Sequence, residues 1–333
     1  MGMSMRVYVT CWTVIIMKSS KVFCRATGGW VTLLLFLYIL RRASSRVIFA
    51  TFAGGCLNGA QRRIGQEARD CGVFDEVHAF DQGSLGPEFW AVHRDFVKRS
   101  PRGYGYWLWK PYFALKLMET MSADDILVFA DAGCTVNCKP VAKQRLLEYL
   151  EMVRSSPYGL LVFQLELHEA KYNKPDLLRY MHANESVYDG RQIVGGIWAL
   201  RKCQHTEFMF RLWYALGGNY HLIDDSKPLL PAVSKRHRYK EHRHDQAIWS
   251  LLVKKYGATI LPDETWPINE SHPIQATKNR AAAVLPGHNP ECRWSPQERL
   301  IYSALALATA AVFVGLGLFA YRRLAPRILR RHR

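Results

Sequence analysis

Residues 102–134 read RGYGYWLWKPYFALKLMETMSADDILVFADAGC, and this stretch decides the fold. Within it, residues 126–130 are five consecutive apolar residues without alternation, a pattern that predicts a central strand covered on both faces of its sheet. Asp131 therefore follows the carboxyl end of a buried strand, the edge at which open α/β sheets bind ligands. Ala132 and Gly133 keep the next turn free of bulk, so that a ligand can approach. Asp131 is either a ligand-binding carboxylate or a cap for the following turn.

Apolar and amphipathic segments alternate on both sides of this strand. The further expected strands are residues 47–52, 74–80 and 160–164, and the expected helices are residues 60–71, 87–98, 140–154 and a segment opened by Pro111. This alternation predicts an α/β, Rossmann-like fold, with a mostly parallel sheet and helices on both faces. From about residue 165 the pattern becomes less regular, which suits a second binding half built on the same sheet.

The formal net charge of +17 belongs mainly to the two ends of the chain. Residues 1–46 hold seven Lys or Arg and no acid, and the last twelve residues hold six Arg and no acid. These thirteen charges leave only +4 for the middle of the chain. A nucleic-acid-binding protein is expected to carry its basic residues on the folded domain, so the distribution argues against a nucleic-acid partner and indicates membrane topology instead.

Residues 301–321 contain no charge over 21 positions, which at 1.5 Å per residue spans roughly 30 Å, the thickness of a bilayer core. We expect a transmembrane helix here, followed by a cytosolic basic tail at residues 322–333. The N-terminal segment, residues 1–45, contains a shorter uncharged run at residues 26–40, which is either a signal-peptide core or a short signal anchor. If it crosses, the middle domain, residues 46–295, lies on the lumenal or extracytoplasmic side of a Golgi- or ER-like membrane, and we expect this arrangement. Otherwise the domain is tail-anchored and faces the cytosol.

Two minor patterns bear on the compartment. Asn184-Glu185-Ser186 and Asn269-Glu270-Ser271 match the acceptor pattern for N-glycosylation, a pattern that also arises by chance. The eight cysteines lack the spacing of a zinc site and read mostly as small buried residues, which leaves the redox compartment open.

The aromatic motif GYGYWLWKPY at residues 103–112, followed by Asp131-Ala132-Gly133-Cys134, resembles a group of GT-A-type glycosyltransferases from polysaccharide loci and large DNA viruses. Four further pieces occur in the order that the family has them, namely Thr51 at a strand end, Lys174 in a YNKPD run, Gly195-Gly196, and His244-Asp245-Gln246. The resemblance covers residues 46–275. It implies a GT-A-like fold and transfer of a sugar from a UDP- or GDP-sugar to a hydroxyl of a glycan, lipid or protein. The alternative is a catalytically inactive, membrane-tethered glycan-binding or scaffold protein.

The resemblance also implies a metal ion, with one departure from the family pattern. Where GT-A enzymes commonly carry Asp-x-Asp, the third position here is Gly133. A bound Mn²⁺ or Mg²⁺ would then depend on Asp131 with phosphate oxygens of the donor. His272 is a further candidate ligand, because such enzymes often use a His late in the domain.

The candidate site residues divide by role. Those assigned to the donor are Thr51, Trp107, Lys110, Asp131, Gly195, Gly196 and Gln246; those assigned to the acceptor side are Lys174 and His244. Asp245 is the first candidate for the base that takes a proton from the acceptor, and Glu166 is the second. Asp245 is otherwise the N-cap of a helix.

The residues themselves bear on three of these assignments. A lysine at a helix start, such as Lys110, is electrostatically disfavoured unless an anion is near. Gly195 and Gly196 interrupt a strand, which indicates either a close approach of another group or a plain β-bulge. The rings of Trp107 and Trp109 suit stacking on a base or sugar, although core packing is expected for at least one of them.

Overall fold

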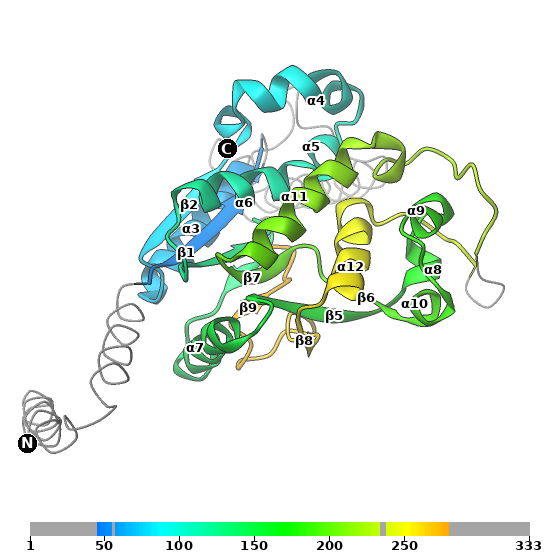
Figure 1. Ribbon diagram of the computed structural model, residues 1–333. Helices are drawn as coiled ribbons and strands as arrows, with labels where there is room; N and C mark the ends of the chain where they lie inside the picture. Colours follow the sequence, from blue (N-terminus) through cyan, green and yellow to red (C-terminus); the bar gives the residue numbers. More distant parts are fainter. Residues whose placement is uncertain (1–44, 55–56, 234–237, 280–333) are drawn as a thin grey trace, which may run out of the picture.

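The computed structural model describes residues 45–54, 57–233 and 238–279. They form a mixed α/β domain in which helices cover a central sheet (Figure 1). The expected segment 1–45, the expected transmembrane helix 301–321 and the basic tail 322–333 lie outside the described residues. Among the residues that are described, no helix has the length and apolarity needed to cross a bilayer.

The strands are β1 Val47–Phe52, β2 Glu76–Phe80, β3 Ile126–Ala130, β4 Thr135–Val136, β5 Leu160–His168, β6 Arg191–Ile193, β7 Ile197–Arg201, β8 Thr259–Pro262 and β9 Ile274–Gln275. The helices are α3 Asn58–Cys71, α4 Pro87–Arg99, α5 Gly103–Tyr106, α6 Trp109–Thr120, α7 Pro140–Ser155, α8 Glu169–Tyr172, α9 Pro175–Tyr180, α10 Glu185–Asp189, α11 Gln204–Gly218 and α12 His244–Tyr256. Each strand and helix that the sequence pattern predicts within the described residues is therefore present, with ends that shift by a few residues.

The central sheet has the strand order β2-β1-β3-β7-β5-β6, and β8 also pairs with β5. Parallel pairing joins β1 to β2, β1 to β3 and β5 to β8. β7 pairs antiparallel with both β3 and β5, so β1, β2, β3, β5 and β8 all run in one direction. β6, which is also antiparallel to β5, runs the other way together with β7. The prediction of a mostly parallel sheet is thus confirmed, with this reversed pair as an exception that the alternation of strands and helices did not predict.

β6 and β7 are two parts of one interrupted strand. Both pair with β5 in the same antiparallel sense, β7 through Leu160–Leu200 and β6 through Gln164–Ile193, and the register shifts beyond Gln164. The interruption contains Gly195 and Gly196, as the sequence predicts. The chain therefore returns antiparallel to β5, and the interruption lies next to the end of β3.

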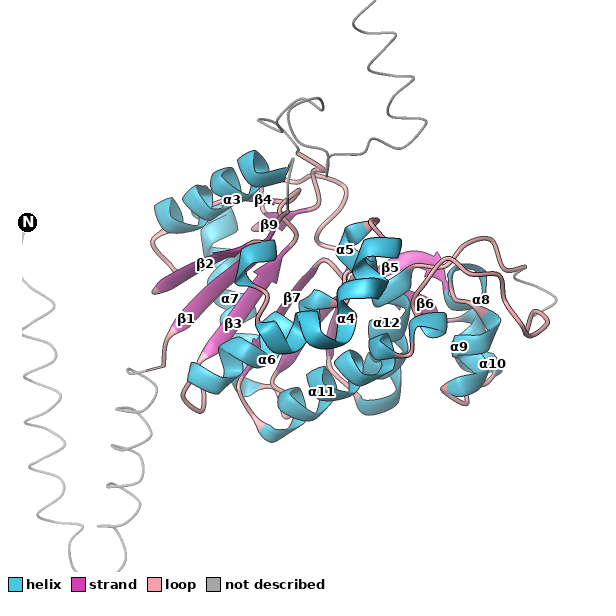
Figure 2. Ribbon diagram, turned by 90° about the horizontal axis from the view of Figure 1, so that it is seen from above, coloured by secondary structure: helices cyan, strands magenta, loops and turns pink. Residues whose placement is uncertain are grey.

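Side chains of β1 and β3 alternate between two cores, one on each face of the sheet. Ile48 and Phe129 pack with α6, α11 and α12, whereas Phe49 and Val128 pack with α3 and α7. Figure 2 shows β2, β1, β3 and β7 side by side, with α6 and α11 along one side and α3 along the other. The expectation of helices on both faces is therefore confirmed. Asp131 continues the alternation, so its side chain belongs to the face covered by α6 and α12.

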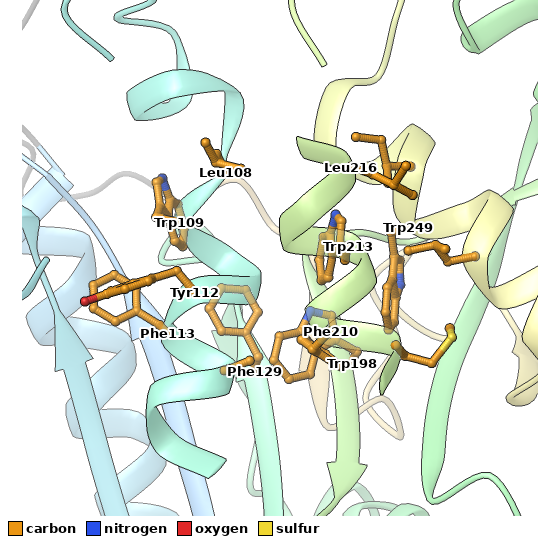
Figure 3. Packing of buried hydrophobic residues seen from close by; sticks show 14 of the residues in the cluster. Leu108, Trp109, Tyr112, Phe113, Phe129, Trp198, Phe210, Trp213, Leu216 and Trp249 are labelled. Atoms are coloured by element: carbon orange, nitrogen blue, oxygen red, sulfur yellow. The ribbon is translucent and has the colours of Figure 1, made fainter. Parts of the chain in front are cut away.

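Large aromatic rings fill the core on that face (Figure 3). Trp109 of α6 stacks on Phe52 with ring centroids 3.8 Å apart, and Trp213 of α11 stacks on Trp249 of α12 at 4.6 Å. All four are buried, and burying one such side chain contributes about 1.5–3 kcal/mol. This packing fixes α6 and α12 against the sheet, and the first turns of these two helices carry the site described below.

A disulfide joins Cys71, at the end of α3, to Cys138, just before α7, with a Cα–Cα distance of 5.3 Å. Within the part of the chain that the structure describes, Cys134 and Cys203 are free, and Cys134 is buried. The expectation of small buried cysteines fits Cys134 but misses the bonded pair, because a separation of 67 residues gives no sequence signal.

Candidate active site

The ammonium group of Lys110 lies at the centre of a buried polar cluster. Its Nζ is 3.1 Å from Asp131 Oδ1 and 2.9 Å from Asp245 Oδ2, and it donates a hydrogen bond of 3.2 Å to the carbonyl oxygen of Gly195. Lys110 belongs to the first turn of α6 and Asp245 to the first turn of α12, while Asp131 follows β3. The anion that the position of Lys110 requires is therefore present, in the form of two carboxylates.

The two carboxylates differ in access to solvent. The side chain of Asp131 is 40% exposed, that of Asp245 only 5%, and that of Lys110 only 3%. Asp131 is thus the member of the cluster that an incoming ligand can touch. Asp245 lies on the inner side of Lys110.

Burial and charge oppose each other within this cluster. Burial alone would lower the pKa of Lys110, but the carboxylates of Asp131 and Asp245 outweigh it and raise that pKa above its ordinary value. Burial raises the pKa of Asp245 to about 6, although Lys110 acts in the opposite direction. The ammonium is therefore charged near neutral pH, and Asp245 gains a proton in mildly acidic solution.

The turn after β3 is held from two sides. The backbone N–H of Asp131 donates to the carbonyl oxygen of Gly196 at 2.8 Å. On the other side, Arg63 Nη2 of α3 donates to the carbonyl oxygens of Ala132 and Cys134 at 3.1 and 2.8 Å. Asp131 thus projects from a turn whose backbone is fixed.

Gly195 and Gly196 are required by close approach. A Cβ on Gly195 would lie 2.8 Å from Gln246 Cβ, and a Cβ on Gly196 would overlap the carboxylate of Asp131. The two glycines let α12 and Asp131 come within contact of the strand. Of the two explanations the sequence left open, close approach is therefore satisfied, and it coincides with the irregular register of β5 and β6.

The aromatic motif forms a left-handed turn. Residues 103–107 all have positive φ, including the non-glycine residues Tyr104, Tyr106 and Trp107 at 56°, 54° and 63°. Left-handed geometry costs a non-glycine residue about 1–2 kcal/mol, so the surrounding contacts must compensate. Tyr106 stacks on the imidazole of His244 with centroids 4.6 Å apart, and Trp109 Nε1 donates to the carbonyl oxygen of Gly103 at 2.9 Å.

This turn brings one tryptophan to the site and another to the core. The ring of Trp107 is half-buried, and its centroid lies 5.8 Å from Lys110 Nζ, within the range of a cation–π contact. Trp109 is 3% exposed and stacks on Phe52. The expectation that at least one of the two packs in the core is confirmed for Trp109.

The residues around Asp245 divide between the site and the scaffold. The N-cap of α12 is Arg243, so Asp245 is not a cap, and its carboxylate binds Lys110 instead. Gln246 Oε1 accepts a hydrogen bond of 3.3 Å from the N–H of Gly195. His244 is buried, and its Nδ1 donates to the carbonyl oxygen of Ile223 at 2.8 Å, so this residue supports the left-handed turn from beneath.

Lys174, the first of the two residues assigned to the acceptor side, is fully buried. Its Nζ donates to the carbonyl oxygen of His221 at 2.6 Å, to Asp224 Oδ1 at 2.8 Å and to Ser226 Oγ at 3.1 Å. Three partners occupy the three N–H donors of the ammonium group. The contacts of Lys174 therefore anchor the segment after α11, and its acceptor-side role stays a prediction.

Two other predicted residues lie apart from the cluster. Glu166 is 88% exposed in its side chain and pairs with Arg191 at 3.2 Å on the surface. Thr51 is fully buried, and by the alternation along β1 its side chain belongs to the face covered by α3, opposite to Asp131. Neither side chain contacts Lys110 among the interactions of the described residues.

The described residues supply only part of the ligands that a divalent ion needs. They contain no group of three or more His, Cys, Asp or Glu side chains that could hold a metal. Because Gln275 pairs with Thr135 and Ile274 with Val136, His272 belongs to the end of the β4–β9 ladder that is farther from Asp131. Asp131 alone, partly exposed, fits an ion of the Mg²⁺ type that takes one carboxylate together with substrate phosphates.

Some residues beside Asp131 carry no sequence signal. The carbonyl oxygen of Gly133 accepts from Asn279 N–H at 2.7 Å and from Thr277 Oγ1 at 3.2 Å, so residues 277–279 flank the turn. Arg63 Nη2 binds the carbonyl oxygen of Asn279 at 3.0 Å as well. These contacts join segments that are far apart in the chain. Single polar residues in a helix or a loop do not predict such contacts.

No family model matches the chain, and no curated protein matches it. Among solved structures, the chain is similar to one described as the crystal structure of a glycosyltransferase involved in the glycosylation of the major capsid of PBCV-1. The two share 8% sequence identity and a TM-score of 0.36, over 69% of this chain and 93% of that one. A similarity of this size is too small to establish a fold or a function.

Proposed function

We propose that this protein is a GT-A-type glycosyltransferase that moves a sugar from a UDP- or GDP-sugar to a hydroxyl of a glycan, lipid or protein. The observation that carries the proposal is the contact of Lys110 with Asp131 at the carboxyl end of β3, the edge where α/β sheets bind nucleotides. The sequence motifs that resemble the family contain both of these residues, and Gly195 and Gly196 of the same resemblance lie against them.

The reaction develops negative charge on the leaving diphosphate, and the cluster can stabilise part of that charge. The bond between the anomeric carbon and the diphosphate oxygen breaks, and the nucleoside diphosphate leaves with the bonding electrons. The acceptor oxygen bonds to the anomeric carbon, and its proton passes to a base or to solvent. Lys110, charged and held by two carboxylates, is a fixed positive group beside the position where the leaving oxygen develops charge.

Asp131 would hold the divalent ion. With both carboxylates ionised, Lys110, Asp131 and Asp245 together carry a net charge of −1, which does not by itself attract a diphosphate. A Mn²⁺ or Mg²⁺ bound by Asp131 together with the phosphate oxygens of the donor would supply the missing positive charge. We therefore expect the metal to bind with the donor rather than before it.

Asp245 acts on Lys110. Its carboxylate is 5% exposed and lies 2.9 Å from the ammonium, so it fixes the position of that group and keeps it charged. In this arrangement Lys110 separates it from the exposed carboxylate of Asp131. We assign Asp245 as the positioning residue of the site, in place of the role as base that the sequence suggested.

The half-buried ring of Trp107 and the backbone of Gly195 complete the proposed donor side of the site. A flat aromatic face next to a bound cation suits a sugar or a base, because such rings stack on both. Membrane anchoring, which the charge pattern at the chain ends predicts, would place the site near a membrane-associated acceptor.

The proposal is tested with purified protein and a panel of UDP- and GDP-sugars, each with and without Mn²⁺. Mass spectrometry follows release of UDP or GDP and formation of glycoside on simple sugar, lipid and peptide acceptors. Binding or hydrolysis of at least one donor, lost in Asp131→Asn, supports the proposal. A fully folded protein that neither binds nor hydrolyses any of them overturns it.

The alternative, an inactive GT-A-like domain that binds glycans, is favoured by Gly133 at the position where the family commonly has its second Asp. The same variant separates the two functions. If Asp131→Asn leaves glycan binding on an array unchanged and wild-type protein turns over no donor, the domain is a binding or scaffold protein.

A further inference from the structure

The chain contains two Asn-x-Ser sequences and no Asn-x-Thr, namely Asn184-Glu185-Ser186 and Asn269-Glu270-Ser271. Both lie within the described residues, and both asparagines are exposed. Asn184 precedes α10, and Asn269 lies in the segment between β8 and β9. The folded domain therefore presents each of these asparagines to solvent, as an N-linked glycan requires.

The two sites share one side-chain contact. Ser186 Oγ donates to Asn184 Oδ1 at 2.7 Å, and Ser271 Oγ donates to Asn269 Oδ1 at 2.9 Å. The oxygen of each side-chain amide is thus engaged, while no hydrogen bond among the described residues uses either amide nitrogen as a donor. The nitrogen that would carry a glycan is free, so its modification breaks no bond of the fold.

A separate observation indicates the compartment. Cys71 and Cys138 form a disulfide across 67 residues, between the end of α3 and the start of α7. Structural disulfides persist in oxidising compartments and are rare in the cytosol. The folded domain is thus suited to the lumen of the secretory pathway, which is where the enzyme that attaches N-linked glycans acts.

We propose that Asn184 and Asn269 each carry an N-linked oligosaccharide. The donor is a lipid-linked oligosaccharide diphosphate. The amide nitrogen forms a bond to the anomeric carbon of the first sugar and loses a proton, and the lipid diphosphate leaves with the electrons of the broken carbon–oxygen bond. The proposal does not depend on the function assigned to the Lys110 cluster.

The full chain, expressed in cultured eukaryotic cells, provides the test. Digestion with peptide N-glycosidase is expected to increase the gel mobility of the wild-type protein by two steps, and Asn184→Gln or Asn269→Gln by one step each. The double variant is expected to show no change. Asn219→Gln, at an exposed asparagine outside any such sequence, is the matched control and should behave as wild type.

Two further measurements distinguish loss of a glycan from a folding defect of a variant. Asn184 caps α10, so Ser186→Ala and Ser271→Ala remove the recognition sequence while they keep the asparagines. Mass spectrometry of peptides cut under non-reducing conditions reports on Asn184, Asn269 and the Cys71–Cys138 bond in one experiment. A wild-type protein with both asparagines unmodified overturns the proposal, and one unmodified asparagine overturns the assignment of that residue.

Discussion

Lys110 of α6 and Asp245 of α12 form a buried ion pair, with 2.9 Å between Nζ and Oδ2. The pair joins the first turns of two helices that pack on the same face of the sheet, and the third member of the cluster, Asp131, is the one that reaches solvent. The ammonium is thus held on its inner side by the buried carboxylate of Asp245 and on its solvent side by the carboxylate of Asp131. Buried charges rarely increase stability over apolar residues of the same size.

The first prediction concerns the stability cost of breaking the cluster. Lys110→Met leaves the carboxylate of Asp245 buried without its partner, and we expect a loss of about 3–5 kcal/mol in the free energy of unfolding. The double variant Lys110→Met/Asp245→Asn should regain most of that loss, because the uncompensated charge is gone. Urea unfolding of wild type, both single variants and the double variant gives the coupling energy. Additive effects would show that the two side chains do not interact.

The second prediction separates the two carboxylates. Asp131→Asn should lower turnover by about 10²- to 10³-fold, the effect of removing one preorganised charge, with a melting temperature close to that of wild type because the side chain is 40% exposed. Asp245→Asn should lower turnover by a smaller factor, since it acts through Lys110. Steady-state kinetics with the preferred donor measures both. A larger loss in Asp245→Asn would restore its assignment as the base.

Much of the fold follows from local patterns. The uninterrupted apolar run of β3 is an Ile126–Ala130 strand in the structure, and the amphipathic periodicity of α3 and α7 appears as two helices on one face. The reversed strand β6–β7 was not predicted, because strand direction is set by how the chain returns across the sheet and not by the residues of the strand.

The site was predictable in part where a residue stands in an unusual place. Lys110 at a helix start required a nearby anion, and close approach was one of two explanations for the glycines in a strand; the structure has both neighbours. For Asp131 the sequence indicated a ligand or a cap, and it did not predict the contact with Lys110. Lys174 and His244 were not predictable in this way, since a polar residue in a loop reads the same whether it is buried by partners or exposed. Burial of a polar side chain depends on tertiary contacts that sequence spacing does not encode.

The third prediction concerns pH. The pKa of Asp245 is raised to about 6 in the folded protein from 3.8 for the free side chain, so the folded state binds the extra proton in this window. The stabilising effect of that proton is present below pH 4 and is lost as pH rises through 6, at about 1.4 kcal/mol per pKa unit, or on the order of 3 kcal/mol in total.

The difference in unfolding free energy between wild type and Asp245→Asn isolates this group from the other carboxylates. The stability of wild type relative to Asp245→Asn should decrease as pH rises from 4 to 6, and the difference should stay constant from pH 7 to pH 8. Urea titrations at these four pH values measure it. A difference that does not vary with pH would mean that Asp245 has an ordinary pKa in the folded protein.

The third prediction has a counterpart of opposite sign at His244, which stacks on Tyr106 of the left-handed turn, and at His242, whose ring lies against that of His244. Burial lowers the pKa of His242 to about 3 and that of His244 to about 4, so both are neutral in the folded protein. Their contribution to stability is present above pH 6.5 and is lost as pH falls toward 4, because only the unfolded chain takes up the protons. His244→Gln should weaken the acid sensitivity of unfolding, as measured by the same urea titrations. An unchanged acid limb would contradict it.

The fourth prediction concerns the order in which metal and donor bind. Because Asp131 is the only carboxylate of the cluster that is open to solvent, Mn²⁺ alone should leave the melting temperature of the nucleotide-free protein unchanged. Mn²⁺ with UDP or GDP, at about 100 times the dissociation constant, should raise it by roughly 5–10 °C. Differential scanning fluorimetry and calorimetric titration follow both. Stoichiometric binding of Mn²⁺ to the nucleotide-free protein would reveal further ligands.

The last prediction tests whether the site depends on the close approach of Gly196 to Asp131. In Gly196→Ala the new methyl group would overlap the carboxylate of Asp131 and displace it from Lys110, so turnover should fall by at least about tenfold. Gly218→Ala is the matched control, because a Cβ at Gly218 meets nothing within 4 Å. Both variants should fold, as judged by circular dichroism. If Gly196→Ala retains the kinetics of Gly218→Ala, the position of the Asp131 carboxylate is not what turnover requires.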